Sequence, residues 1–110
     1  MSRRAQRADL DFTIASPALL GPTPTGEKWE IFGISYATDG TLAVTFYLAL
    51  ATVAGFRFRD QFTVPAGVFG LYKQYDGLVQ LDPEGMYVIA SSAGTPAVNA
   101  TVDYVVVNPA

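Results

Sequence analysis

The chain has 110 residues, contains no cysteine and no histidine, and carries a formal net charge of −3. The missing cysteines exclude disulfides, thiolate nucleophiles and cysteine-based zinc sites, and the missing histidines remove the commonest general acid–base group. Half of the residues are hydrophobic, which suits one folded domain of ordinary size. We therefore expect a protein that is not an enzyme, with no catalytic residue, no cofactor and no metal site.

The amino-terminal end is basic, whereas the rest of the chain is acidic. Arg3, Arg4 and Arg7 precede a remainder that holds four basic and ten acidic residues, a net charge of −6. A basic terminal segment on an acidic domain can bind an acidic neighbouring protein. The alternative is that this terminus is solvated and disordered. Three arginines are too few for a nucleic-acid footprint, so no specific nucleic acid is expected. No apolar run of a secretion signal follows them.

Residues 1–27 show no long run in which apolar and polar side chains alternate. Residues 9–15 predict a first short strand or an extended arm, and residues 16–26 contain three prolines, which are typical of a linker or of a segment lying along a surface. We therefore divide the chain into an extended N-terminal arm or linker, residues 1–27, and a β-sandwich domain, residues 28–110.

Residues 28–37 predict a strand with an irregularity. Trp29 and Ile31 share one face, while Phe32 begins the opposite face. The adjacent pair Ile31 and Phe32 indicates a β-bulge, or a strand that is covered on both sides. We expect Trp29 to face outward.

Clear alternation predicts the next two strands. After an Asp-Gly turn, residues 42–50 alternate, with Tyr47 on the outward face. Residues 56–64 alternate again and place Phe58 inward. Asp60 falls on the same inward side, which indicates a bulge or a strand end at that position.

The closing segment predicts a pair of strands. Residues 85–92 include Tyr87, which we place among the outward aromatic residues, and residues 98–107 alternate with the period of a half-buried strand. Val105 and Val107 add apolar side chains to the outward face of that last strand, where a monomer would carry polar residues. The closing strand is therefore a candidate for a subunit contact.

The spacing of the strands indicates the architecture. Two short strands, at residues 68–73 and 77–81, complete a set of seven or eight at intervals typical of a sandwich or small barrel. No segment has a convincing helical period with caps, and the chain has no room for the helical crossovers of a parallel sheet. The sequence predicts an all-β fold, an antiparallel β-sandwich of jelly-roll or Greek-key type, with an extended N-terminal arm.

The predicted outer surface carries little charge. Only 15% of the residues are charged, against about 25% in average soluble domains, and an apolar surface promotes association. We therefore expect a homo-oligomer whose faces are covered by copies of the chain or by other proteins. The candidate interface residues are Arg3, Arg4, Arg7, Trp29, Tyr47, Tyr87, Val105 and Val107.

Three segments carry a resemblance to a known group of proteins. Residues 64–67 read VPAG, residues 78–92 contain a turn followed by a VIAS strand, and residues 98–104 read VNATVDY. This pattern of strands and turns is similar to that of small β-sandwich structural proteins of tailed bacteriophages, and it extends over residues 28–107. The chain departs from the pattern at Glu84, which precedes a glycine where the pattern has glycine followed by a polar residue.

The resemblance implies a component of the virion that is made in the host cytoplasm. It implies a capsid decoration protein or a head–tail or tail accessory subunit, with other virion proteins of the capsid, neck or tail as partners and no catalytic residue. No membrane is expected, because the longest apolar stretch, residues 42–55, is too short to span a bilayer. The arm would be the docking element. The alternative is a carbohydrate-binding β-sandwich module involved in adsorption, in which surface aromatic residues such as Trp29 and Tyr47 would form the sugar platform.

Overall fold

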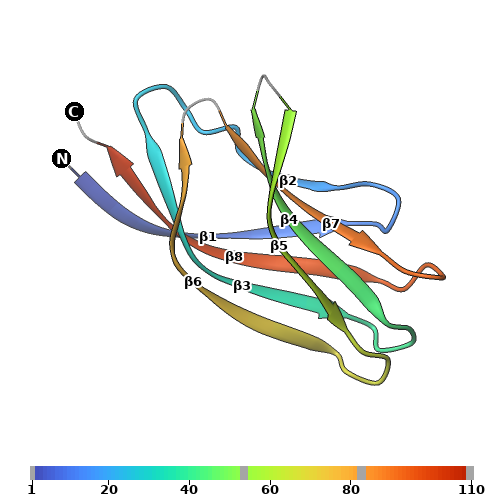
Figure 1. The fold of residues 1–110 in the computed structure, drawn as a ribbon. Coiled ribbons are helices and arrows are strands. Elements are labelled where there is room, and N and C mark those ends of the chain that lie inside the picture. The colour runs from blue at the N-terminus through green and yellow to red at the C-terminus, as the bar shows by residue number, and fades with distance from the viewer. Residues whose placement is uncertain (1, 53–54, 82–83, 109–110) are drawn as a thin grey trace.

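The computed structural model describes residues 2–52, 55–81 and 84–108, and this part of the chain is built from β-strands without a helix (Figure 1). Alternating side chains place apolar residues on one side of each long strand, as half-buried strands require. The strands are β1 (Ser2–Phe12), β2 (Ala18–Leu20), β3 (Lys28–Thr38), β4 (Val44–Thr52), β5 (Gly55–Val64), β6 (Gly70–Leu81), β7 (Gly85–Ser91) and β8 (Val98–Asn108).

The strands form two four-stranded antiparallel sheets, in the orders β1-β8-β3-β6 and β2-β7-β4-β5. The first strand pairs with the last, the second with the seventh, the third with the sixth and the fourth with the fifth. This order arises when one long hairpin is rolled up on itself, which is the topology of an eight-stranded jelly roll. The prediction of an antiparallel β-sandwich of jelly-roll type is therefore confirmed.

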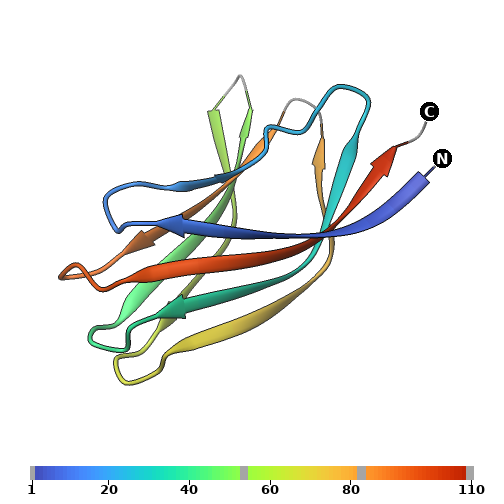
Figure 2. The same cartoon turned by 180° about the vertical axis from the view of Figure 1, so that it is seen from behind.

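The connections are sorted between the two ends of the sandwich. The turns that join β1 to β2, β3 to β4, β5 to β6 and β7 to β8 gather at one end, which we call the loop end (Figures 1 and 2). The two chain termini lie together at the opposite end, because β1 and β8 are antiparallel neighbours.

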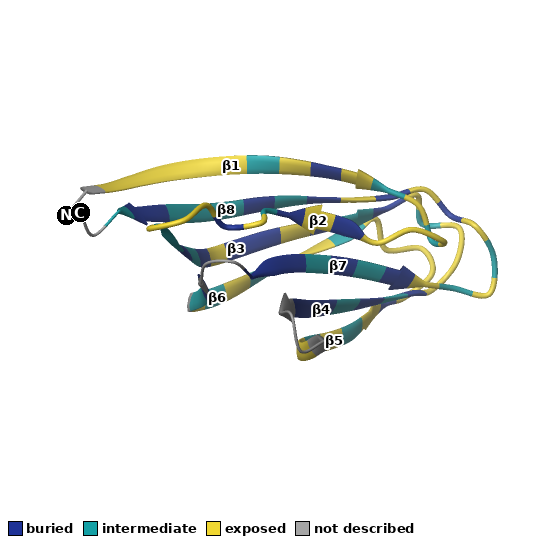
Figure 3. Cartoon of the chain, turned by 90° about the horizontal axis from the view of Figure 1, so that it is seen from above, coloured by how far each residue is buried: buried dark blue, intermediate teal, exposed yellow. Residues whose placement is uncertain are grey.

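The core lies between the two sheets and is made mainly of aliphatic side chains, together with a cluster of three aromatic rings. Tyr36 of β3 packs against Phe46 of β4 and Phe62 of β5, with ring centroids 5.1 and 4.7 Å apart. Burial of this kind supplies most of the free energy that opposes the loss of chain entropy. Burial is concentrated on the facing sides of the sheets, whereas β1 is exposed along much of its length (Figure 3).

The first 27 residues supply an edge strand to each sheet. Residues 2–12 pair with β8 over the whole length of β1, and β2 pairs with β7 at residues 18–20. Leu10 and Leu20 from these strands belong to the core cluster. Strand pairing in these residues was expected only for a short stretch near 9–15, and the division into an arm and a domain at residue 27 stays a prediction.

The segment from residue 70 to residue 81 differs from expectation. It forms the single strand β6, whereas the sequence predicts two short strands separated at Asp76 and Gly77. The pairing with β3 shifts register between Ile31 and Gly33 and passes over residues 75–77 of β6. An irregularity in the ladder thus accommodates the Asp-Gly pair without ending the strand.

Candidate interaction surface

A row of uncharged residues crosses the outer face of the β2-β7-β4-β5 sheet. Leu19 of β2 is in register with Tyr87 of β7, Tyr87 with Ala49 of β4, and Ala49 with Phe58 of β5. Leu19 is exposed, and Phe58 has 66% of its surface exposed. The row therefore presents large apolar side chains at both edges of the sheet. We call it the apolar row.

Two further rows continue this face toward the loop end. In the next row, Ile89 of β7 and Gln61 of β5 flank Tyr47 of β4, whose ring lies edge-on to that of Phe58 at a centroid distance of 6.1 Å. The last row consists of hydroxyl residues, in which Thr45 and Thr63 are joined by a hydrogen bond of 2.9 Å and Ser91 completes the row. The face thus changes from apolar to hydroxyl-bearing without a charged residue at any of these positions.

The prediction that Phe58 faces inward is wrong, and a β-bulge is the reason. Leu48 pairs with Asp60, but the next residue of β4, Ala49, pairs with Phe58, so that Arg59 is an extra residue in β5. An extra residue reverses the alternation beyond it. The bulge that Asp60 indicated is confirmed, and its consequence for Phe58 creates one end of the apolar row.

The prediction that Trp29 faces outward is also wrong. Trp29 is only 9% exposed and packs against Tyr104 with ring centroids 4.9 Å apart. The pairing of β3 with β8 shifts between Ile31 and Gly33, which makes Phe32 the extra residue of a bulge. Because of this shift, Trp29 and Ile31 face the same core as the residues beyond the bulge. Trp29 is therefore not available as a surface platform.

The three arginines of β1 lie on the free edge of the other sheet. Arg3 forms an ion pair with Glu30 of β3 at 2.6 Å, and Arg7 forms one with Asp103 of β8 at 2.8 Å. Arg4 is exposed and is in register with a core residue of β8. Two of the three guanidinium groups thus fasten β1 to its own sheet, where exposed pairs contribute little to stability.

Val105 and Val107 lie on the outer face of the same sheet but are covered by their neighbours. Val107 is 2% exposed and stands in register with Arg3 on one side and Lys28 on the other. Val105 is half-buried in the next row. The expectation that Val107 offers apolar surface to a partner is therefore wrong, because long charged side chains cover apolar neighbours with their stems.

The two outer faces of the sandwich thus differ in chemistry. The face of the β1-β8-β3-β6 sheet carries acidic and basic residues and ion pairs, whereas the three rows of the β2-β7-β4-β5 face carry none. Of the predicted interface residues, Tyr47 and Tyr87 lie on the uncharged rows, whereas Arg3 and Val107 are neighbours in the other sheet. Leu19 and Phe58 were missed because one lies in the proline-rich segment and the other beyond a bulge.

A partly buried polar network joins the free edges of the two sheets. Asp60 of β5 forms an ion pair with Lys73 of β6 at 2.9 Å and accepts a hydrogen bond of 2.8 Å from Tyr75, whose hydroxyl is 2.9 Å from that of Tyr36. Burial raises the pKa of Asp60, but the hydrogen bonds from Lys73 and Tyr75 outweigh it, so that the pKa lies below its ordinary value. Burial raises the pKa of both tyrosines, which therefore stay neutral.

A second polar cluster fastens the segment before β3 to the start of β7. The fully buried Gln80 donates hydrogen bonds to the carbonyl oxygens of Leu20 and Glu84, at 3.1 and 3.0 Å. Thr23 donates to the same Glu84 oxygen from its backbone N–H at 2.9 Å and from its hydroxyl at 3.2 Å. Arg57 forms an ion pair of 2.6 Å with the Glu84 side chain. These bonds satisfy backbone groups that would otherwise be buried without partners.

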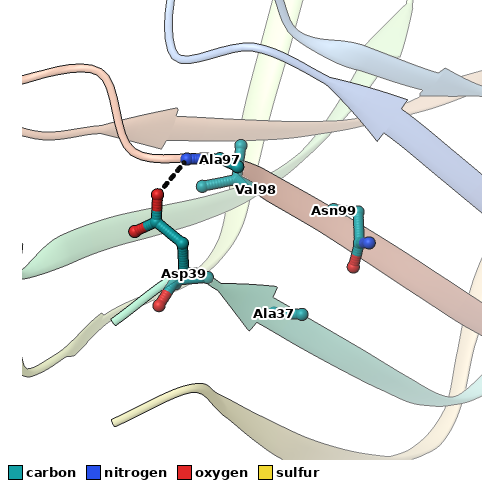
Figure 4. Close-up of a pocket in the computed structure, with 6 residues that line it drawn as sticks. Ala37, Asp39, Ala97, Val98 and Asn99 are labelled. Carbon is teal, nitrogen blue, oxygen red and sulfur yellow. Dashed lines mark hydrogen bonds between the residues drawn. The ribbon is translucent and has the colours of Figure 1, made fainter. Parts of the chain in front are cut away.

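A shallow hollow of about 170 Å³ lies at the loop end, between the end of β3 and the start of β8 (Figure 4). Asp39 points across it and accepts a hydrogen bond from the backbone N–H of Ala97 at 3.0 Å. The Thr41 hydroxyl also donates to Asp39, at 2.7 Å, and these hydrogen bonds lower the pKa of the carboxyl. The carboxylate thus holds two neighbouring loops together.

The loop end also exposes apolar side chains. Phe69, with 71% of its surface exposed, and Val68 precede β6, and Leu42 lies in the adjoining loop. Thr38 holds this segment in place, because its backbone N–H donates to the Phe69 carbonyl at 2.8 Å and its hydroxyl donates to the Val68 carbonyl at 3.1 Å. The loop end is therefore an ordered second apolar surface, smaller than the sheet face.

In the described ranges, no cluster of three or more acidic side chains has the arrangement of a metal site. Across the same residues, none of the structure is a helix long and apolar enough to cross a membrane. No protein-family model matches the chain, and no curated protein sequence matches it.

Proposed function

We propose that the chain is a non-enzymatic structural protein of a bacteriophage virion, which acts by self-assembly and by docking to other virion proteins. The observation that carries the proposal is the set of three uncharged rows on the outer face of the β2-β7-β4-β5 sheet, with Tyr87 and Phe58 exposed to different degrees. Aromatic residues are enriched and charged residues depleted at the centres of protein interfaces. The resemblance of residues 28–107 to phage sandwich proteins supplies the biological setting.

Within a particle, a capsid decoration protein or a head–tail or tail accessory subunit would use such a domain as a rigid spacer. The edge strand β1, with Arg3, Arg4 and Arg7, offers a second contact for a neighbouring virion protein. The exposed edge of a sheet can pair with another chain, and basic side chains favour an acidic one. The proposed place of action is the virion, after synthesis in the host cytoplasm.

The alternative, a carbohydrate-binding module, depends on fewer residues than the sequence indicated. Trp29 is buried, which leaves Tyr47, Tyr87 and Phe58 as the aromatic side chains of the sheet face. A glycan array on the purified protein separates the two proposals. Binding that is lost in a Tyr47→Ala variant would favour the carbohydrate-binding module.

The test of virion membership uses phage particles released by a host that carries the reading frame. We expect mass spectrometry to find the chain in density-purified particles, in a fixed ratio to the major capsid protein. The matched control is the soluble fraction of the same lysate, in which an enzyme of the host should remain. Recovery of the chain from the soluble fraction alone would exclude a virion structural role.

A further inference from the structure

We propose that the outer face of the β2-β7-β4-β5 sheet binds the same face of a second copy of this chain, and that the two copies are related by a two-fold axis parallel to the strands. The proposal rests on the self-assembly part of the proposed function and names its surface and its partner. Closed pairs of this kind are the commonest oligomers, and in them one surface patch meets itself.

Charge favours a second copy as the occupant. The chain has a net charge of −3, so two copies repel each other weakly, and a contact that brought like-charged side chains together would add to this repulsion. The three rows from Leu19 to Ser91 hold no acidic or basic residue at their register positions. These three rows can therefore meet the same rows of a second copy without bringing like charges together, and without the cost of burying a charge.

The order of the strands decides which residues would face each other under this symmetry. A two-fold axis parallel to the strands reverses the strand order, so that β7 faces β4 of the second copy and β2 faces β5. Tyr87 then lies over Ala49 of the second copy, and Phe58 lies over Leu19 of the second copy. Ala49 has no exposed surface, so Leu19 and Phe58, the exposed apolar residues of the row, would make the principal contacts.

The remaining rows follow the same relation. Ile89 would lie over Tyr47 of the second copy, and Ser91 over Thr45 of the second copy. The apolar row thus meets the apolar row, and hydroxyl residues meet hydroxyl residues. A two-fold axis across the strands would instead place apolar side chains on hydroxyl groups, which would bury polar groups without assured partners.

The size of the face indicates a modest affinity. β7 has seven residues and pairs with β4 over all of them, β5 continues the sheet beyond β4, and β2 adds only three residues. With strands about 4.8 Å apart and residues about 3.3 Å apart, this gives roughly 380 Å² of flat sheet in each copy. Two copies together would cover on the order of 800 Å², which is the size of a weak, transient contact. We therefore expect a dimer that dissociates on dilution, with a Kd on the order of 10 µM.

Sedimentation velocity over a dilution series tests the proposal with single variants. We expect Leu19→Glu and Phe58→Lys each to weaken dimerisation by about 10-fold or more, because each buries a charge against an apolar side chain. Tyr72→Glu, at an exposed position of the opposite sheet, is the matched control and should leave the dimer unchanged. Circular dichroism verifies that each variant is folded.

The double variant Leu19→Glu with Phe58→Lys tests the geometry itself. Positions 19 and 58 lie on opposite edges of the sheet, separated by about 14 Å within one copy. The proposed symmetry places position 19 of one copy against position 58 of the other. We therefore expect the double variant to recover most of the affinity that each single variant loses.

A folded protein that stays monomeric at about 100 µM, or a dimer that Tyr72→Glu disrupts and Phe58→Lys does not, would overturn the proposal. Failure of the double variant to recover affinity would overturn the stated symmetry. These outcomes are independent of virion membership. A dimer with the predicted variant pattern would stand even if the chain were missing from particles.

Discussion

At the scale of single residues, Asp60 shows how a charge is accommodated between the sheets. The alternation of β5 predicts that Asp60 faces inward, and it does. Its partners Lys73 and Tyr75 come from β6, and Tyr36 extends the network to β3. Removing one member of a partly buried ion pair leaves the other without compensation, which is costly.

Replacing Asp60 with asparagine should reduce the acid sensitivity of the fold. A carboxyl group whose pKa is lowered on folding stabilises the protein above its unfolded pKa, here 3.8, and this stabilisation is lost as the pH falls through the folded value. We expect Asp60→Asn to be about 1–3 kcal/mol less stable near neutral pH. Toward pH 3, the difference from the wild type should shrink. Urea denaturation of both proteins at several pH values measures this difference in the free energy of unfolding.

The control for this variant is Asp76→Asn, the same change at an exposed position of β6, which should have little effect at any pH. Some acid sensitivity should persist in Asp60→Asn, since the pKa of Asp39 is also lowered by its hydrogen bonds. A constant stability difference between Asp60→Asn and the wild type at all pH values would show that Asp60 does not titrate as described.

At the scale of the elements, bulges decide which residues reach the surface. β5 has its extra residue at Arg59, and β3 has its extra residue at Phe32. The first bulge turns Phe58 outward, and the second turns Trp29 inward. The surface of each strand thus depends on one position at which the ladder is broken.

Deletion of Arg59 should be tolerated, whereas deletion of Gln61 should not. Without Arg59 the ladder becomes regular, and Phe58 still faces outward while Asp60 still faces inward. Without Gln61, the alternation moves Asp60 to the outer face, and Lys73 loses its ion-pair partner. We expect the second deletion to cost at least about 3 kcal/mol more than the first, as measured by urea denaturation. Equal losses would contradict this account of the bulge.

At the scale of the whole molecule, the rolled-up hairpin makes the two ends of the chain depend on each other. β1 pairs with the last strand, and β2 pairs with β7. Most of the ladders therefore join residues far apart in sequence. Such contacts form late and cooperatively, because the entropy lost on closing long loops has to be offset before the contacts stabilise the chain.

The chain should accordingly unfold in one transition. Trp29 is the only tryptophan and packs against Tyr104, so its fluorescence reports on the β1-β8-β3-β6 sheet. We expect the fluorescence and far-ultraviolet circular dichroism curves to coincide in urea, as a two-state transition requires. An early circular dichroism change, before the fluorescence change, would indicate that residues 1–27 unfold separately.

Much of the fold and part of the surface could be predicted from the sequence. Alternation located β4, β5 and β8, and the position of Asp60 indicated the bulge in β5. Most of β1 was not predicted. Tyr47 was placed correctly on the outer face. The short β2 could not be predicted, because its three residues in a proline-rich segment are held by pairing with β7. The continuity of β6 was hidden by Asp76 and Gly77, which normally mark a turn.

By itself, the sequence determined that the chain forms antiparallel strands, because a period of two is a local property of residues along one strand. Only the tertiary structure decided which side of each strand meets the core. That choice depends on register, and one extra residue at Arg59 or Phe32 reverses it. The uncharged face with Tyr87 and Phe58 therefore exists only once four strands from distant parts of the chain lie side by side.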